Sequence, residues 1–205
     1  MSDTETTTAL ASARPKRADA LRNYEKLIGA ARSAFAEDGV STSLEDVARR
    51  AEVGIGTLYR HFPSRQALLE AVYLDELHAF CDSAPQAAEL PSWEALIGWL
   101  RGFVAYLATK RALADELMSY IDSDAELFQA CRTELYAAGG PLLERAQQAG
   151  VVRTDIDFTE LIQMVGGIAK ISGMDPLQIG NILDVALDGL RYTGASRVRA
   201  GSSAA

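Results

Sequence analysis

The chain has 205 residues, a formal net charge of −8 and a hydrophobic content of 48%. This composition supplies enough apolar side chains for a packed core and excludes a chain that is disordered throughout. No run of about 18 apolar residues occurs, residues 1–10 lack the basic start and apolar stretch of a secretory signal, and only two cysteines are present. We therefore expect a protein of the reducing cytoplasm without a membrane partner.

The charge is unevenly distributed along the chain. Residues 14–65 contain ten Lys and Arg against seven Asp and Glu, whereas residues 66–205 contain ten against nineteen. A basic region on an otherwise acidic chain favours a nucleic-acid contact at that end and a body that avoids phosphates. Ordinary variation in surface charge would give similar numbers, so the asymmetry alone does not decide the function.

Nearly the whole chain after residue 15 shows the spacing of amphipathic helices, and no segment shows sustained strand alternation. Residues 1–15 are polar and are predicted to form a disordered arm, and residues 194–205 a frayed tail. The predicted helices cover residues 18–37, 44–51, 55–61, 64–81, 92–109, 112–121, 125–149, 158–172 and 176–192. The pattern predicts an all-α fold of about nine helices.

The most informative stretch runs from Ser43 to Arg65 and has the sequence SLEDVARRAEVGIGTLYRHFPSR. Its two short helices are separated by a tight break of about four residues at 51–54, which is the geometry of a helix-turn-helix. Thr42 or Ser43 can cap the first of these helices. The stretch therefore predicts a DNA-binding domain, which we place at residues 16–65.

The second short helix, residues 55–61, is unusually polar for a core element. A helix of about two turns does not persist alone, and a recognition helix would insert such side chains into the major groove. Thr57 and Arg60 are candidates for reading base edges, and Ile55 could contact a thymine methyl group. Phosphate contacts, which fix register rather than sequence, are expected from three polar side chains, namely Tyr59, His61 and Arg65.

Two glycines, Gly54 and Gly56, keep the start of that helix slim, so that backbone amides can approach phosphates. An alternative stays open for Tyr59 and His61, which could be packing residues of a small helical domain.

The same stretch closely resembles the DNA-binding domain of tetracycline-repressor-like (TetR/AcrR) regulators, over roughly residues 18–77. The matching positions are Thr42, Val47-Ala48, Ala51-Glu52-Val53, the run GTLYRHF from Gly56 to Phe62, and Pro63-Ser64-Arg65. Many family members have Ser near Gly54 and a polar residue near Ile55, and this chain departs from them there. The resemblance implies DNA contacts from Thr42, Ser43, Gly54, Ile55, Gly56, Thr57, Tyr59, Arg60, His61 and Arg65.

The resemblance also implies a second, variable domain, which we place at residues 66–193 and expect to bind a ligand and to dimerise. The predicted helix over 92–109 is apolar over about half of its circumference, which is wider than a surface helix requires. Such a helix contacts the core and, in addition, either a cavity or a partner, although plain core packing would also account for it. The candidate ligand-binding residues are Trp99, Phe103, Tyr106, Met118, Phe128 and Met164.

The last two predicted helices, 158–172 and 176–192, carry surplus apolar surface. Such surface suits a self-complementary interface across a two-fold axis, although burial within a monomer would also account for it. A homodimer would present two recognition helices to a near-palindromic operator in double-stranded DNA. The resemblance makes a bacterial repressor that is released by a small, mostly apolar effector the expected function.

Other functional classes find less support. No Ser-His-Asp set, phosphate loop, HExxH or CxxC motif occurs, so we expect no enzyme and no cofactor. His78 and Cys81 could share a metal on one helix face, but no further Cys or His lies near them in the sequence, and no metal is expected. The alternative function is a helical small-molecule-binding protein without regulatory DNA binding.

Overall fold

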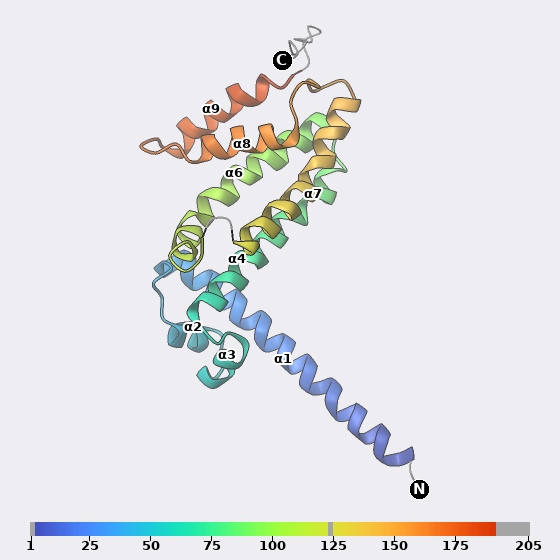
Figure 1. The fold of residues 1–205 in the computed structure, drawn as a ribbon, viewed down its shortest axis with the longest axis vertical. Helices are drawn as coiled ribbons and strands as arrows, with labels where there is room; N and C mark the ends of the chain where they lie inside the picture. The colour runs from blue at the N-terminus through green and yellow to red at the C-terminus, as the bar shows by residue number, and fades with distance from the viewer. Residues whose placement is uncertain (1–2, 123–124, 192–205) are drawn as a thin grey trace, which may run out of the picture. The chain divides into compact units, whose positions relative to one another are not determined.

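The structure, a computed structural model, describes residues 3–122 and 125–191, with side chains from Ala18 on. Over these residues the chain is all-α, with no strand and one isolated bridge between Val152 and Arg191. The helices are α1 (Asp3–Asp38), α2 (Leu44–Arg50), α3 (Ile55–His61), α4 (Arg65–Cys81), the short α5 (Ser83–Ala87), α6 (Ser92–Leu117), α7 (Glu126–Gln148), α8 (Phe158–Ala169) and α9 (Pro176–Asp188), as labelled in Figure 1.

The helices divide into two compact units. Among the described residues, unit 1 comprises residues 3–75 with 112–122, and unit 2 comprises residues 76–111 with 125–191. Helices α4 and α6 contribute residues to both units.

Unit 1 is built around α1, which packs against α2, while α2 packs against α3 (Figure 1). Gly39 adopts a positive φ of 84° directly after α1, as expected for a left-handed C-terminal cap. The core of unit 1 consists of fully buried or nearly buried apolar side chains, because each of these helices turns one apolar stripe inward. Among them are Leu27, Ala31, Val47, Leu58, Leu68 and Leu69.

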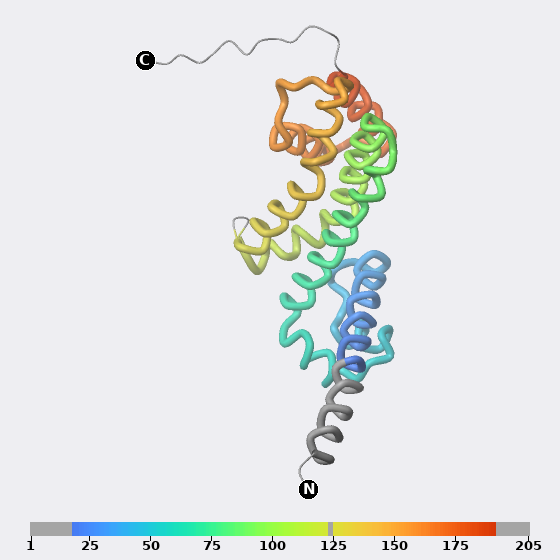
Figure 2. Tube along the Cα trace, turned by 90° about the vertical axis from the view of Figure 1, so that its right-hand side faces the viewer, coloured from blue at the N-terminus to red at the C-terminus, as the bar shows by residue number. Residues whose placement is uncertain are grey.

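Unit 2 joins α6 and α7 to the pair α8 and α9. The last two helices lie side by side in both views (Figure 2) and are in contact. Both begin with a capping box, formed by Asp157 with Glu160 and by Asp175 with Gln178, which satisfies backbone amides that would otherwise lack acceptors. The apolar core of the unit includes Leu96, Leu100, Leu142, Leu161, Val165, Leu183 and Leu187.

The predicted helices 158–172 and 176–192 end earlier in the structure, at Ala169 and Asp188, and three larger differences occur elsewhere. Helix α1 begins at Asp3 and therefore includes residues 3–15, for which an unstructured arm is predicted; Ala and Leu in that stretch favour helix, whereas its Thr residues and Pro15 do not. The two helices predicted over 92–109 and 112–121 form one helix, α6, because Lys110 and Arg111 between them are good helix formers. Residues 83–87 of the predicted loop form α5.

The predicted tail of residues 194–205 lies outside the described residues. Residue 193, where the predicted second domain ends, also lies outside them.

Candidate nucleic-acid interface

Helix α2 begins at a well-formed N-cap. The Ser43 hydroxyl accepts a hydrogen bond from the Asp46 backbone N–H at 3.1 Å and donates one to the Asp46 carboxylate at 2.9 Å. Of the two capping candidates in the sequence, Ser43 is therefore the cap. Hydrogen bonding from Arg49 and from Ser43 lowers the pKa of the Asp46 carboxyl below its ordinary value, so this carboxylate stays charged at the positive end of the helix.

The turn between α2 and α3 has the backbone geometry of a helix-turn-helix. Glu52 adopts a left-handed conformation with φ of 55°, which lets the chain reverse within four residues. The Val53 N–H donates to the Ala48 carbonyl oxygen at 3.0 Å and closes the turn. Leu58 of α3 is fully buried, and this anchor fixes α3 against the rest of unit 1.

The opposite face of α3 is exposed. Ile55 and Tyr59 expose 39% and 45% of their surface, which is high for side chains of this size. Arg60 is exposed as well, and within the described part of the chain its guanidinium has no hydrogen bond or ion pair. Thr57 and His61 lie at the edge of this face, half-buried. The face thus combines a free cation, an exposed phenol and an apolar side chain.

Space is left around the two glycines at the start of α3. A Cβ atom built on Gly54 or on Gly56 would meet no heavy atom within 4 Å, and neither glycine has a positive φ. Neither folding geometry nor internal packing therefore requires glycine at these positions, which leaves close approach of an external partner as a physical reason for their size.

His61 belongs to a small aromatic group in unit 1. Its ring lies 6.1 Å from the ring of Tyr24 on α1 and 6.2 Å from that of Phe62, and Tyr24 and Phe62 lie 5.3 Å apart. His61 thus packs on one side while part of it remains accessible. This is the packing role that the sequence left open for His61, and it does not extend to the exposed Tyr59.

Two of the predicted contact residues face inward. Thr42 is buried and its hydroxyl donates to the Gly39 carbonyl oxygen at 2.8 Å. Arg65 is half-buried, donates to the Thr42 carbonyl oxygen at 2.7 Å and lies 3.7 Å from the Glu116 carboxylate. In this geometry both side chains serve the frame of the helix-turn-helix and do not lie on its exposed face.

The two arginines at the end of α2 are paired with acidic side chains. Arg49 contacts Asp46 at 2.5 Å, and Arg50 contacts Glu37 at 2.6 Å and also Asp38. The hydrogen bond that Arg50 donates to the Glu37 carboxylate raises the pKa of the Arg50 guanidinium. These pairs occupy the arginines within the protein, so their charges are partly neutralised there.

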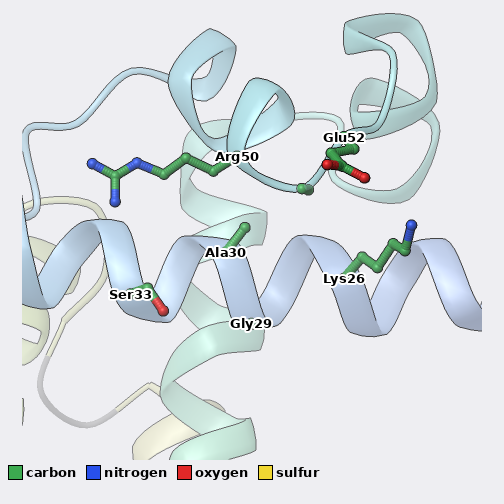
Figure 3. A pocket seen from close by; sticks show the side chains of 7 residues that line it. Lys26, Gly29, Ala30, Ser33, Arg50 and Glu52 are labelled. Atoms are coloured by element: carbon green, nitrogen blue, oxygen red, sulfur yellow. The ribbon is translucent and has the colours of Figure 1, made fainter.

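A groove of about 510 Å³ lies between α1 and the end of α2, and Figure 3 shows the side chains that line it. Its floor is made by small residues of α1, and charged side chains stand at its rim. The lining residues are Lys26, Gly29, Ala30, Ser33, Arg50, Ala51 and Glu52. Sequence reasoning missed this groove, and the only signal for it was the run of small residues on one side of α1.

The predicted ligand-binding residues fall into separate places. Trp99, Phe103 and Tyr106 form one aromatic cluster with Phe80, with ring centroids 4.7 to 6.3 Å apart. Both Trp99 and Phe103 are buried, and within the described residues the indole N–H of Trp99 has no hydrogen-bond partner. The structure therefore brings three of the six candidates together inside unit 2.

The other candidates lie elsewhere. Met118 belongs to unit 1, where it exposes 48% of its surface. Met164 on α8 lines a groove of about 430 Å³ together with Ile156 and Ala186. Phe128 lies half-buried on α7. The sequence grouped these apolar side chains as candidates but did not distinguish which helix faces meet.

No metal centre is formed by the residues that the structure describes: they contain no group of three or more His, Cys, Asp and Glu side chains that could hold an ion. His78 lies 3.2 Å from Glu134, and Cys81 is a buried free thiol. Burial raises the pKa of Cys81 to about 12, so the thiolate that a metal requires is disfavoured. None of the helices in the described part of the chain is long and apolar enough to cross a membrane.

Two family models match the chain. Residues 27–72 match the model described as bacterial regulatory proteins of the tetR family, and residues 91–192 match the C-terminal domain of SbtR-like transcriptional regulators. A solved TetR transcriptional regulator from Streptomyces coelicolor, SCO0520, is 41% identical, with a TM-score of 0.70 over 82% of this chain and 98% of that one. The chain belongs to the TetR family. Members of this family are transcriptional regulators and not enzymes, as the sequence analysis expected.

Two further relatives agree with this assignment. The TetR transcription regulatory protein from Mycobacterium vanbaalenii is 34% identical, with a TM-score of 0.70 over 86% of this chain and 99% of that one. The HTH-type transcriptional regulator SrpR from Pseudomonas putida is 34% identical over 87 residues, which make up 42% of this chain. The match spans only 41% of the length of that curated relative.

Proposed function

We propose that this TetR-family chain is a transcriptional repressor that binds a near-palindromic operator as a homodimer in the cytoplasm and is released by a small, mostly apolar effector. The observation that carries the proposal is the exposed face of α3, where Arg60, which has no ion-pair partner among the described residues, accompanies exposed Tyr59 and Ile55. An accessible face that combines a free cation with donors and an apolar group suits the edges and phosphates of a major groove.

The proposed contacts divide by chemistry. Arg60 and Thr57 would read base edges, Ile55 would meet a thymine methyl group, and Tyr59 and His61 would bind phosphate. Gly54 and Gly56 would admit the DNA backbone close to α3, since nothing in the protein fills the space beside them. Ser43 is exposed at the start of α2, where its hydroxyl would contact a phosphate. Thr42 and Arg65 would support this surface from within.

The proposed dimer would form through α8 and α9. On α9, Leu177 and Val185 expose 80% and 76% of their surface, and Met174 just before it exposes 44%. Large apolar side chains rarely remain this exposed in a monomer. The glycines Gly167 and Gly180 on the two helices have open space beside them, which permits close approach of another helix.

The proposed effector site lies at the aromatic cluster of unit 2. Trp99 supplies a buried N–H donor without a partner among the described residues, and leaving such a donor unsatisfied costs about 1–3 kcal/mol. A mostly apolar ligand with one acceptor atom would satisfy it. Release then follows from a population shift: a ligand that prefers the state with poorly spaced recognition helices lowers operator affinity, and the operator lowers ligand affinity by the same factor.

Selection from a pool of random duplex DNA with the full chain, followed by titration of the recovered duplex at several salt concentrations, tests the proposal. We expect a near-palindromic duplex whose affinity for the protein falls as the salt concentration rises. Arg60→Ala should lower this affinity, whereas the matched control Arg49→Ala, which removes a charge already paired with Asp46, should change it little. Failure of the refolded, dimeric protein to enrich any sequence would contradict the proposal and favour a small-molecule-binding protein without regulatory DNA binding.

A further inference from the structure

Arg65, the first residue of α4, connects two distant parts of unit 1. Its Nη1 donates to the carbonyl oxygen of Thr42 at 2.7 Å, and its Nε lies 3.7 Å from Oε1 of Glu116 near the end of α6. The side chains of Arg65 and Glu116 expose only 24% and 31% of their surface. The guanidinium is thus held between a backbone acceptor and a carboxylate, in a setting where removal of the carboxylate leaves a poorly solvated charge.

The acceptor end of this contact lies at a decisive point of the helix-turn-helix. Thr42 immediately precedes Ser43, the N-cap of α2. The Thr42 hydroxyl is already bound to the Gly39 carbonyl oxygen, so its side chain and its carbonyl oxygen are both held. The peptide plane that leads into α2 is therefore fixed from two sides. The turn after α2 sets the direction of α3. A change in the orientation of the peptide group between Thr42 and Ser43 would therefore also shift the exposed face of α3.

The carboxylate end of the contact belongs to a helix that extends into unit 2. Helix α6 runs from Ser92 to Leu117, and its residues belong to unit 2 up to Arg111 and to unit 1 from Ala112. The Tyr120 hydroxyl lies 3.5 Å from Glu116 Oε1 and contributes a further polar contact there. Helix α6 has two adjacent acidic residues at this end, Asp115 and Glu116. Of these two, Glu116 contacts Arg65 and Asp115 does not.

We propose that Glu116 is a positioning residue for operator binding, which acts through Arg65 to hold the carbonyl group of Thr42 and thereby the start of α2. The inference rests on the proposed DNA-binding function. It assigns Arg65 to the frame of the interface, whereas a direct phosphate contact would require its guanidinium to leave both partners. It also predicts that loss of a negative charge at position 116 weakens binding, the reverse of the general electrostatic effect of removing an acid near DNA.

The test compares Glu116→Gln with Asp115→Asn in the full chain. Both substitutions remove one negative charge at adjacent positions of α6, but Asp115 is exposed and has no contact with Arg65. The probes are the duplex recovered by the wild-type chain from a random pool and an unrelated duplex of the same length. Dissociation constants are measured at several salt concentrations, well below the melting temperature of each variant.

We expect Glu116→Gln to weaken binding of the recovered duplex by about threefold to fivefold and to leave binding of the unrelated duplex unchanged, because only the register of α3 is affected. Asp115→Asn should bind both duplexes as well as the wild type or slightly better. A general loss of protein stability would weaken binding of both duplexes, so it would not produce this difference between them. If Glu116→Gln instead binds the recovered duplex more tightly, Glu116 competes with phosphate for Arg65 and the inference is overturned.

Arg65→Gln provides a second, independent measurement. A side chain that binds phosphate contributes to the salt dependence of binding. Its removal therefore makes the negative slope of log K against log salt concentration less steep, by about one. A positioning role predicts an affinity loss with the slope of the wild type. Amide hydrogen exchange in the absence of DNA should show faster exchange over 43–51 in Glu116→Gln but not in Asp115→Asn. Unchanged exchange there would contradict the inference.

The two levels of failure are distinguishable. If the wild-type chain recovers no duplex, the proposed function fails and the inference falls with it. If the wild type recovers a duplex and Glu116→Gln binds it like Asp115→Asn, only the inference fails.

Discussion

The indole ring of Trp99 on α6 lies against the backbone of Gly139 on α7. A Cβ atom at position 139 would come within 2.5 Å of the indole and within 2.4 Å of the Phe158 ring. The missing side chain is therefore what lets α6, α7 and the start of α8 share one aromatic cluster. Gly139 is buried in the middle of a helix, where glycine is otherwise unfavourable, so the close approach of the rings explains its presence.

Replacement of Gly139 by Ala should destabilise unit 2. The added methyl group would overlap with two rigid rings, and overpacking of this kind costs about 1–3 kcal/mol. Chemical denaturation, followed by circular dichroism, measures the change. The control is Gly140→Ala in the same helix, where a Cβ atom meets nothing within 4 Å; it should stabilise the protein by up to about 1 kcal/mol through helix propensity. Equal effects of the two substitutions would refute this account of Gly139.

Lys110 on α6 and Glu76 on α4 form an ion pair that is largely buried. The Lys110 side chain exposes only 6% of its surface and that of Glu76 20%. Lys110→Met should therefore destabilise the protein by about 3–5 kcal/mol, because it leaves the glutamate poorly solvated and without its main counter-charge.

Addition of Glu76→Leu to Lys110→Met should recover most of that stability, since replacing both members of a buried pair by apolar groups is often neutral. Arg101 and Asp184 form an exposed pair at 2.8 Å and provide the comparison; Arg101→Met should cost less than about 1 kcal/mol. Denaturation midpoints of the three variants and the wild type test this prediction, and a double variant as unstable as Lys110→Met would contradict it.

The helix-turn-helix could be predicted closely from the sequence because local signals define its ends. Helix α3 has the predicted bounds, 55–61, since Gly54 precedes it and Pro63 soon follows it. The Ser43 cap and the positive φ of Gly39 follow from side-chain and backbone chemistry that acts over a few residues.

Contacts between distant residues could not be predicted in this way. The predicted helices 92–109 and 112–121 leave Lys110 between them, and only the ion pair with Glu76 shows why this residue is buried. Met118 was grouped with Trp99 as a candidate ligand-binding residue, yet the two residues belong to different units. The placement of Arg65 against Thr42 and Glu116 likewise depends on residues 23 and 51 positions away, which no local pattern reveals.

The two cysteines should be unreactive in the folded protein. Burial raises the pKa of Cys81 to about 12 and that of Cys131 to about 11, and the nearby Glu134 carboxylate adds to both shifts. At pH 8 the reactive thiolate of Cys81 would then amount to roughly one part in ten thousand. A chromogenic disulfide reagent should label neither thiol in the native protein and both after denaturation; rapid labelling of the native protein would contradict these shifts.

The same shifts have a consequence for stability at high pH. Because each thiol has a higher pKa when folded than when unfolded, the unfolded state loses its protons first. Stability should therefore be unaffected below the unfolded value near 9.0 and should fall as the pH rises towards 11 and 12. Denaturation midpoints of the wild type and of Cys81→Ala between pH 8 and 11 would measure this loss. An equally steep fall in both proteins would assign it to other groups.

Gly56 offers a substitution that should separate folding from DNA binding. It lies in the first turn of α3, has no positive φ, and a Cβ atom there would meet nothing within 4 Å. Gly56→Ala should therefore leave the fold intact and raise stability by about 0.5–1 kcal/mol, because Ala favours helix. If DNA approaches this end of α3, the same methyl group should weaken operator binding by about tenfold, equivalent to about 1.4 kcal/mol.

The matched control for Gly56→Ala is Gly98→Ala on α6, where the glycine is also exposed, helical and free of neighbours within 4 Å. It should give a similar gain in melting temperature with unchanged affinity for the recovered duplex. Opposite changes in stability and affinity at position 56, with a change in stability alone at position 98, would mean that the small size of Gly56 serves a partner outside the chain. Wild-type affinity in a stabilised Gly56→Ala would instead remove this end of α3 from the interface.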